Sequence, residues 1–415
     1  MSLAIPALVK RNVALFAIAQ SFTGAGTQFS YGFGPLMVVS LTDSAGLAGL
    51  SVALVGVSRF LVAYPMGKIT DSRGRKSGIY LGLALALAGT LTLGLAMVVK
   101  SIWLFVFGML LFGMGMNGAQ QMRVGAADMF PPSMRAQGLG YLALGSLGGL
   151  VISPILVALA DPLSRMLGVD PLGLPWFFMP LLILLGMSVV AFVRPDPKDI
   201  GMNLPAYWPG YKAPEPRAGA ATPVAGEFTP MKLWRDPAAR LAILSNCAGT
   251  GNMSIVMVLT SLVLAHHGHS LVAIAASHTF HAIGMFAFTI PLGKLADRFG
   301  RSKVMYPGVF VSLVGAALVA FTPSMITVTL GTFLVGVGWA AANVAATALV
   351  ADRVATEERG RAIGVNDTFG GASTVFAAFV TGPLIEWQGL AATGVTAIVL
   401  AAIPLLVRAF SGPAK

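Results

Sequence analysis

Long apolar stretches occupy most of the chain, and each is bounded by charged residues or by clusters of proline and glycine. The stretches are about 20 residues or longer, the length of helix that crosses the hydrocarbon core of a bilayer. They lie at about 12–41, 46–66, 77–99, 102–128, 136–160, 173–193, 240–265, 270–292, 303–322, 325–350, 362–385 and 389–410. The pattern predicts an all-α membrane protein with twelve transmembrane helices.

The segment 194–238 breaks this pattern. It holds nine of the 25 prolines of the chain, and proline interrupts a helix because it lacks the backbone N–H. No continuous helix is expected there. The sequence therefore predicts an N-terminal six-helix half at 1–193, a cytoplasmic proline-rich linker at 194–238 and a C-terminal six-helix half at 239–415.

Composition excludes an ordinary soluble protein. Hydrophobic residues make up 56% of the chain and charged residues 10%, whereas soluble chains carry about 25% charged residues. A water-facing surface cannot be built from so few charges. The single cysteine, Cys247, excludes an intramolecular disulfide framework and every cysteine-rich metal motif.

The net charge of +11 is explained by the orientation of the chain in a membrane rather than by binding to a nucleic acid. If both termini and the linker are cytoplasmic, 23 of the 27 Lys and Arg residues lie on the cytoplasmic side, as the positive-inside rule requires. Lys100 and Arg165 lie outside, and Arg59 and Arg123 lie within helices. We therefore expect the lipid bilayer and a small substrate as partners, and no nucleic acid.

One set of residues occurs twice in the chain, with a constant offset of 226 positions. In the order of the chain, Gly67, Asp71, Gly74, Arg75, Asn117 and Arg135 return as Gly293, Asp297, Gly300, Arg301, Asn343 and Arg361. Such a repeat predicts two pseudo-symmetric halves. Secondary transporters with duplicated halves bind their substrate near the bilayer midplane, where the halves meet.

The loop from Gly67 to Lys76 reads GKITDSRGRK. It resembles the GxxxDxxGRK signature of the major facilitator superfamily, and the second copy begins at Gly293. The resemblance implies the major facilitator fold, transport by alternating access, and a gating role for the repeated residues, among them Arg135 and Arg361. No catalytic triad, Walker loop or dinucleotide fingerprint appears in a suitable context, so we expect no enzyme activity.

All five histidines fall within sixteen residues: His266, His267, His269, His278 and His281. Nearby, Met253 and Met257 are four residues apart, and so are His281 and Met285, so each pair lies on one helix face. If the two helices run antiparallel from a turn near Gly268, the four side chains lie within about six residue positions of one another in membrane depth, or about 9 Å. Thioether and imidazole ligands suit Cu(I). The competing interpretation is methionine packing beside a buried, hydrogen-bonded histidine.

The MxxxM and HxxxM pattern of these four residues resembles the bacterial copper importers of the superfamily that serve cytochrome oxidase assembly, together with their wider family. The resemblance implies Cu(I) import across the inner membrane, with the four residues as ligands and copper as cargo rather than cofactor. Relatives in the wider family take up riboflavin, so riboflavin or another organic solute is the alternative cargo. A third interpretation is a non-transporting membrane receptor or assembly factor.

The turn histidines, with His278, are candidates for metal capture, although the turn fits an ordinary solvated loop equally well. Arg59 and Arg123 are charges at membrane depth, which are costly unless they are paired or face water. They either pair with Asp128 or Asp367 in the gate or bind an anionic organic solute, which favours a flavin-like cargo. Further candidates for lining a cavity include Tyr31, Asn117, Asn252 and Asn343. We expect a monomer in a bacterial inner membrane with both termini cytoplasmic.

Overall fold

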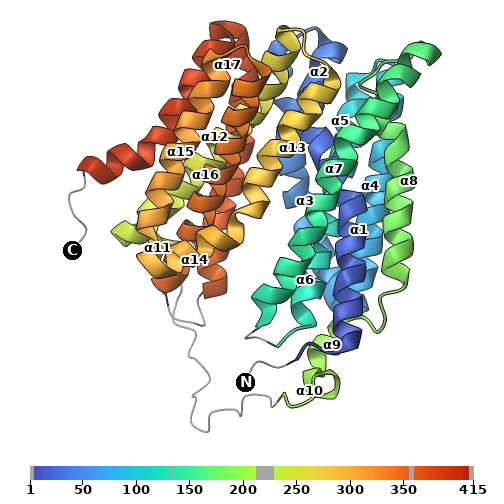
Figure 1. Cartoon of the computed structure of the whole chain (residues 1–415), viewed down its shortest axis with the longest axis vertical. Coiled ribbons are helices and arrows are strands. Elements are labelled where there is room, and N and C mark those ends of the chain that lie inside the picture. The colour runs from blue at the N-terminus through green and yellow to red at the C-terminus, as the bar shows by residue number, and fades with distance from the viewer. Residues whose placement is uncertain (1–3, 132–133, 212–228, 355–358, 411–415) are drawn as a thin grey trace. The chain divides into compact units, whose positions relative to one another are not determined.

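A computed structural model describes residues 4–131, 134–211, 229–354 and 359–410, and these residues fold into helices joined by short connections (Figure 1). In the first part of the chain the helices are α1 (Ala7–Gly32), α2 (Gly34–Thr42), η1 (Ala45–Leu47), α3 (Leu50–Arg73), α4 (Arg75–Val98), α5 (Ile102–Ala119), α6 (Gln121–Asp128), α7 (Arg135–Leu167) and α8 (Leu174–Ala191). Then follow α9 (Pro197–Met202), α10 (Leu204–Tyr207), α11 (Pro230–Arg235), α12 (Pro237–His266), α13 (Leu271–Ala287), α14 (Thr289–Phe299), α15 (Ser302–Phe321), α16 (Met325–Asp352) and α17 (Arg359–Phe410). The all-α prediction is confirmed.

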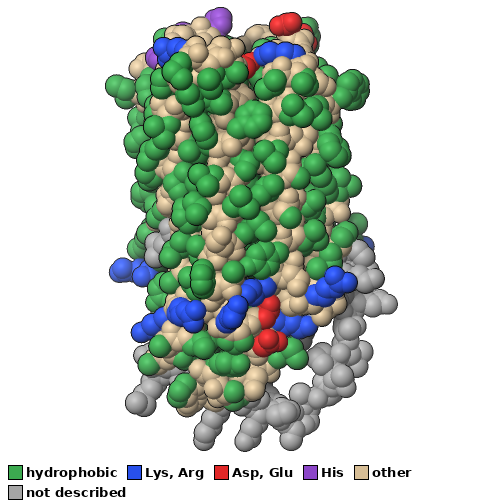
Figure 2. Space-filling model, turned by 90° about the vertical axis from the view of Figure 1, so that its right-hand side faces the viewer, with side chains coloured by type: hydrophobic (Ala, Val, Ile, Leu, Met, Phe, Trp, Pro, Cys, Tyr) green, Lys and Arg blue, Asp and Glu red, His purple; other side chains and the backbone are tan. Residues whose placement is uncertain are grey.

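Ten helical stretches within the described ranges are long and apolar enough to cross a membrane. The last of them, Val365–Phe410, contains two predicted spans, which meet at a kink where Gly389 has a φ of 81°. Other predicted spans are divided instead: 12–41 into α1 and α2, 102–128 into α5 and α6, and 270–292 into α13 and α14. On the face drawn in Figure 2, hydrophobic side chains cover the middle, and most of the Lys and Arg side chains lie toward one end, with a few at the other.

The chain forms two compact units. The first unit consists of residues 1–30 and 54–217, and the second consists of residues 31–53 and 218–415. The second unit thus includes 31–53 in addition to the predicted C-terminal half. Residues 31–53 belong to the second unit because η1 and the residues after it pack closely on α17. A Cβ atom at Gly49 would lie 1.7 Å from Ala378 O.

Within the first unit, α4 packs against α5 and α8. The approach of α4 to α5 is so close that a Cβ atom at Gly89 would lie 2.4 Å from Phe112 N, and one at Gly115 would lie 2.2 Å from Ala86 N. Small residues allow such backbone contact between membrane helices, where van der Waals packing takes the place of the hydrophobic effect.

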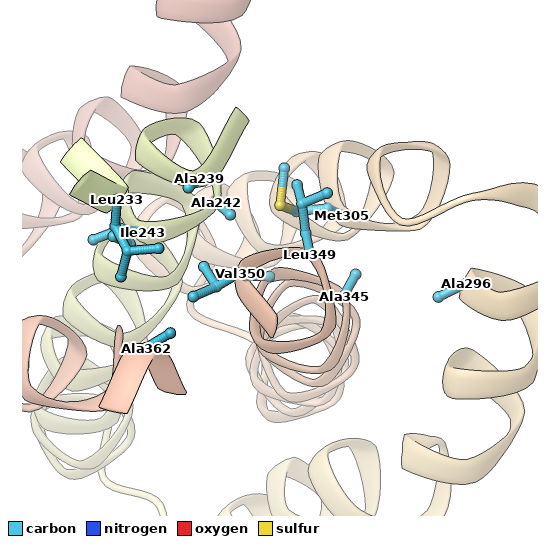
Figure 3. Packing of buried hydrophobic residues seen from close by; sticks show 11 residues of the cluster. Leu233, Ala239, Ala242, Ile243, Ala296, Met305, Ala345, Leu349, Val350 and Ala362 are labelled. Atoms are coloured by element: carbon cyan, nitrogen blue, oxygen red, sulfur yellow. The ribbon is translucent and has the colours of Figure 1, made fainter. Parts of the chain in front are cut away.

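The second unit repeats this contact between α15 and α16. A Cβ atom at Gly315, which is 226 residues after Gly89, would lie 2.5 Å from Gly331 O. At one end of the unit, small and branched apolar side chains from six helices form a buried cluster (Figure 3): Leu233, Ala239, Ala242, Ile243, Ala296, Met305, Ala345, Ala346, Leu349, Val350 and Ala362. The repeat therefore extends from the loop residues to helix packing.

The described parts of the predicted linker contain the short helices α9, α10 and α11, as its prolines predict, and the linker ends at the start of α12. Its first part is folded against the first unit. Trp208 is fully buried, its Nε1 donates a hydrogen bond of 2.9 Å to Met129 O, and its ring packs on Phe130 with centroids 5.5 Å apart. Residues 212–228 lie outside the described ranges.

Candidate functional site

The repeated loop of the first unit is held by one carboxylate. Gly74 has a φ of 93°, a conformation that favours glycine, and Asp196 accepts hydrogen bonds of 3.0 Å from the backbone N–H groups of both Arg75 and Lys76. Asp196 thereby caps the N-terminus of α4, which carries a partial positive charge. In return, Lys76 Nζ donates to the carbonyl oxygen of Val193, just after α8, at 2.8 Å.

The loop arginine of each unit forms an ion pair. Arg75 Nε lies 2.7 Å from Asp128 Oδ2 at the end of α6, and Arg301 Nε lies 3.2 Å from Asp352 Oδ2 at the end of α16. Gly300 has a φ of 99°, matching Gly74. The structure differs here from one expectation for the intramembrane arginines, because the partner of Asp128 is Arg75 from the start of α4.

The predicted loop from Gly67 to Lys76 is helical in its first part, because α3 continues to Arg73 and the chain turns only at Gly74. Gly67 and Asp71 lie on α3, Gly293 and Asp297 on α14, and Arg135 and Arg361 near the starts of α7 and α17. The side chains of Asp71, Asp297, Arg135 and Arg361 lie outside the described part of the structure. Their gating role stays a prediction.

The predicted metal ligands lie on α12 and α13. Met257 and His281 are 3% and 2% exposed, and Met253 and Met285 are partly buried. His281 Nδ1 lies 2.8 Å from the carbonyl oxygen of Thr332 on α16. Since a carbonyl only accepts hydrogen bonds, Nδ1 carries the proton, and Nε2 of the neutral ring keeps a free lone pair.

His278 is part of a buried hydrogen-bond chain. Ser261 Oγ donates to Gly32 O at 2.7 Å and lies 2.9 Å from His278 Nε2. Because a hydroxyl has one proton, the imidazole Nε2–H is the donor to Ser261. His278 is only 1% exposed, so it lies apart from the exposed turn histidines, and its role in metal capture stays a prediction.

The contact between Ser261 and His278 also sets the register of the antiparallel helices α12 and α13. One turn farther into the pair, Met257 lies at about the depth of His281, and a further turn brings Met253 to about the depth of Met285. The matching depth that the sequence predicted therefore has a structural basis. The hydrogen bond to Thr332 turns one edge of the His281 ring toward α16.

The turn histidines do not converge. The rings of His266 and His267 are 5.4 Å apart, His267 Nδ1 donates to Val263 O at 2.8 Å, and His269 Nε2 donates to Pro323 O at 3.3 Å. Among the described residues, no three His, Cys, Asp or Glu side chains are placed to hold a metal ion together. His266 and His267 instead border a mainly apolar cavity of about 860 Å³ in the second unit.

The intramembrane arginines of the first unit line one cavity of about 550 Å³. Polar side chains dominate its wall, which consists of Arg59, Val62, Met66, Asn117, Gln120, Gln121, Arg123 and Val124. The crossing of α3 and α5 explains why these residues meet. A Cβ atom at Gly113 would lie 2.1 Å from Ser58 Oγ, so the helices touch beside Arg59, and Asn117 follows one turn after Gly113.

The remaining cavity candidates have different surroundings. Asn252 is fully buried, and its Nδ2 donates to Ser312 O on α15 at 3.4 Å, so it joins two packed helices. Asn343 Nδ2 donates to Asn246 Oδ1 at 2.9 Å, and Asn246 Nδ2 donates to Asn366 O at 3.0 Å. Sequence reasoning missed Asn246 and Asn366, since the positions 226 residues earlier hold different residues, Gln20 and Gly140. Tyr31 is half-buried at the end of α1.

A family comparison decides the class of protein. The model of the Major Facilitator Superfamily matches residues 16–240 and 241–414. The chain belongs to the Major Facilitator Superfamily. It is therefore a membrane transporter and not an enzyme, and both expectations are confirmed.

This chain is similar to two relatives over most of their length. It is 27% identical over 363 residues to the uncharacterized MFS-type transporter YdeG of Bacillus subtilis (strain 168), covering 87% of this chain and 82% of the relative. It is 25% identical over 422 residues to the riboflavin transporter RfnT of Brucella anthropi, covering 96% of each.

Two solved structures share the fold. The nucleoside transporter NupG has a TM-score of 0.67 at 13% identity, covering 98% of each chain. A bacterial homolog of the human lysosomal transporter Spinster, in an inward-facing unoccupied conformation, also has a TM-score of 0.67 at 13% identity, covering 96% of this chain and 97% of that one. At this identity the likeness extends to the fold alone.

Proposed function

We propose that this transporter takes up a polar organic solute, and that riboflavin is the first solute to test. The cavity lined by Arg59 and Arg123 carries the proposal. Its volume of about 550 Å³ falls within the range of about 300–1,000 Å³ typical of small-molecule sites. Five of its eight lining residues present guanidinium or amide groups, which donate hydrogen bonds to carbonyl and anionic oxygens.

The similarity to RfnT extends over 96% of both chains, which supports riboflavin ahead of other solutes. The ion pairs at the loop arginines of both units support a moving transporter over a static receptor, because a receptor has no need of the same latch twice. We place the protein in the inner membrane of a bacterium, with both termini cytoplasmic, in accord with its distribution of Lys and Arg.

Riboflavin uptake in a bacterial riboflavin auxotroph tests the proposal. Expression of the wild-type chain should restore growth at low riboflavin. Arg59→Gln should lower the uptake rate about tenfold or more, equivalent to about 1.4 kcal/mol, while Met257→Ala should leave it unchanged. Immunoblots of the membrane fraction check that all variants insert equally. If the wild-type protein inserts and riboflavin uptake equals that of empty-vector cells, riboflavin is not the cargo.

A second candidate function is Cu(I) import, and the tautomer of His281 favours it. A histidine that ligates a metal commonly donates its other ring N–H to a backbone carbonyl, as His281 Nδ1 does to Thr332. Met257 lies at about the same depth on α12 and supplies a thioether, a soft ligand suited to Cu(I). This candidate requires Nε2 of His281 and the sulfur of Met257 to reach one ion.

Copper accumulation in cells separates the two candidates. Under Cu(I) import, His281→Ala and Met257→Ala should both lower cellular copper to the level of empty-vector cells. Met202→Ala is the matched control, since Met202 is an exposed methionine on α9 rather than on α12 or α13. Unchanged copper in the His281 and Met257 variants, at equal protein level, eliminates these residues as ligands.

A further inference from the structure

Arg59 carries a positive charge at a depth in the bilayer where charged residues are rare. It lies within Ala45–Val62, one of the stretches able to cross a membrane, and about 14 Å along α3 from Leu50. Its side chain is exposed, and among the described residues it has no hydrogen-bond or ion-pair partner. A guanidinium at this depth is costly unless it is paired or faces water. The polar cavity that it lines meets that requirement.

Two described acidic side chains of the first unit are engaged away from the cavity. Asp128, on the same short helix as Arg123, pairs with Arg75 at 2.7 Å, and Asp196 caps α4. No Asp or Glu is among the described residues that line the cavity, whereas Arg59 and Arg123 both line it. The described wall therefore presents positively charged and amide groups, and a cleft lined by one sign of charge attracts ions of the opposite sign.

We propose that this cavity recognises an anionic group, a phosphate or carboxylate, on the transported solute, with the Arg59 guanidinium as its direct partner. The inference rests on the proposed function and narrows its substrate class. The planar guanidinium donates two parallel hydrogen bonds to a carboxylate or phosphate. The amides of Asn117, Gln120 and Gln121 surround the same space and are available to the uncharged polar part of the solute.

Ligand binding to the purified full-length protein tests the inference. Isothermal titration calorimetry in lipid nanodiscs compares riboflavin with riboflavin 5′-phosphate, which differ by one phosphate group, and nicotinate provides a carboxylate arm. At least one anion, riboflavin 5′-phosphate or nicotinate, should bind about tenfold or more tightly than riboflavin, and inorganic phosphate or acetate should compete with it. The affinity should weaken as salt is added, because ions screen the attraction.

Variants identify the partner group. Arg59→Gln should abolish the preference for the anion, Arg59→Lys should retain part of it because the charge remains, and Arg123→Gln should weaken it. Arg298→Gln is the control, since Arg298 is an exposed arginine of the second unit, stacked on Phe299. Size-exclusion profiles and unfolding temperatures report whether each variant is folded, and Arg123→Gln replaces Arg59→Gln if the latter does not fold.

Two results would overturn the inference. If riboflavin binds as tightly as both anions, or if Arg59→Gln leaves anion affinity unchanged, the cavity does not select for negative charge, while riboflavin uptake in the auxotroph still supports the proposed function. If neither anion binds to the folded wild-type protein, the inference fails, and the auxotroph assay decides the proposed function separately.

Discussion

The charged residues that bear on the proposed function have two kinds of surroundings. Arg75, Asp128, Arg301 and Asp352 form ion pairs at helix ends, whereas Arg59 lines a cavity without a partner among the described residues. The first group holds the repeated loops, and the second is available to a solute. This division makes Arg59 the residue on which the proposed function depends.

The two ion pairs should differ in strength. The side chains of Arg75 and Asp128 are 16% and 24% exposed, and those of Arg301 and Asp352 are 24% and 50% exposed. Solvent screens the second pair more. A double-mutant cycle with Arg75→Gln and Asp128→Asn should give a coupling free energy of about 1 kcal/mol, and the cycle with Arg301→Gln and Asp352→Asn should give less. Unfolding by sodium dodecyl sulfate measures both, and a larger coupling in the second pair contradicts the account.

The sequence identified the arginines and carboxylates but not their partners. Asp128 was one of two carboxylates, with Asp367, that the sequence offered as partners for the intramembrane arginines. Its partner comes instead from the start of α4, because the turn at Gly74 brings Arg75 to the end of α6. Similarly, the spacing of the histidines grouped His278 with the turn, whereas helix periodicity turns it inward to Ser261. Tertiary pairings of this kind cannot be derived from spacing in one sequence.

The N-termini of α4 and α15, the helices that follow the two repeated loops, have different surroundings. Gly74 and Gly300 share a backbone conformation with φ of 93° and 99° and ψ of 164° and 146°, which is nearly exclusive to glycine. Asp196 caps only the first of them. A Cβ atom at Gly74 would lie 2.8 Å from Asp196 Oδ2, whereas a Cβ atom at Gly300 would meet nothing within 4 Å.

This difference predicts unequal effects of the same substitution. Gly300→Ala should lower the free energy of unfolding by about 1–3 kcal/mol through backbone strain alone. Gly74→Ala should lower it by about 1 kcal/mol more, since the new methyl group displaces the capping carboxylate. Asp196→Asn in the Gly74→Ala background should then add little. Equal losses for the two alanine variants would mean that Asp196 does not stabilise the start of α4.

Most elements follow from the hydrophobic pattern, but their ends do not. The apolar stretch 12–41 continues through Phe33 and Pro35, where the helix breaks into α1 and α2, because apolar character alone does not mark a break at proline. The predicted break between 362–385 and 389–410 is confirmed, because Gly389, with a φ of 81° and a ψ of 175°, interrupts the helical backbone of α17. The periodic signal gives the order of the membrane segments, while local backbone chemistry sets where each helix starts and stops.

At the scale of the whole molecule, the distribution of Lys and Arg predicts the orientation in the membrane. With the termini and 194–238 on the cytoplasmic side, the turn at His266–His269 faces outward. In a Cys247→Ser background, His267→Cys should react with a membrane-impermeant maleimide added to intact cells. Lys198→Cys should react only after the membrane is permeabilised. The reverse labelling pattern would invert the orientation.

The repeat is the feature of the whole molecule that the sequence predicts best. The constant offset of 226 residues predicted two related units. The close glycine contacts of α4 with α5 and of α15 with α16 show that the helix packing is repeated as well. The cargo is less accessible to sequence reasoning, because the methionine and histidine pattern and the arginine cavity favour different solutes. The 550 Å³ cavity, which only the folded first unit reveals, shifts the preference toward an organic solute.

Solute flux through the purified protein tests the central claim most directly. Proteoliposomes that contain this protein alone are loaded with unlabelled riboflavin or riboflavin 5′-phosphate, and the entry of the same labelled solute is followed. We predict saturable exchange of at least one of the two, reduced about tenfold or more by Arg59→Gln and unaffected by Arg298→Gln. Wild-type flux equal to that of protein-free liposomes for both solutes, or equal flux in wild type and Arg59→Gln, would contradict the account.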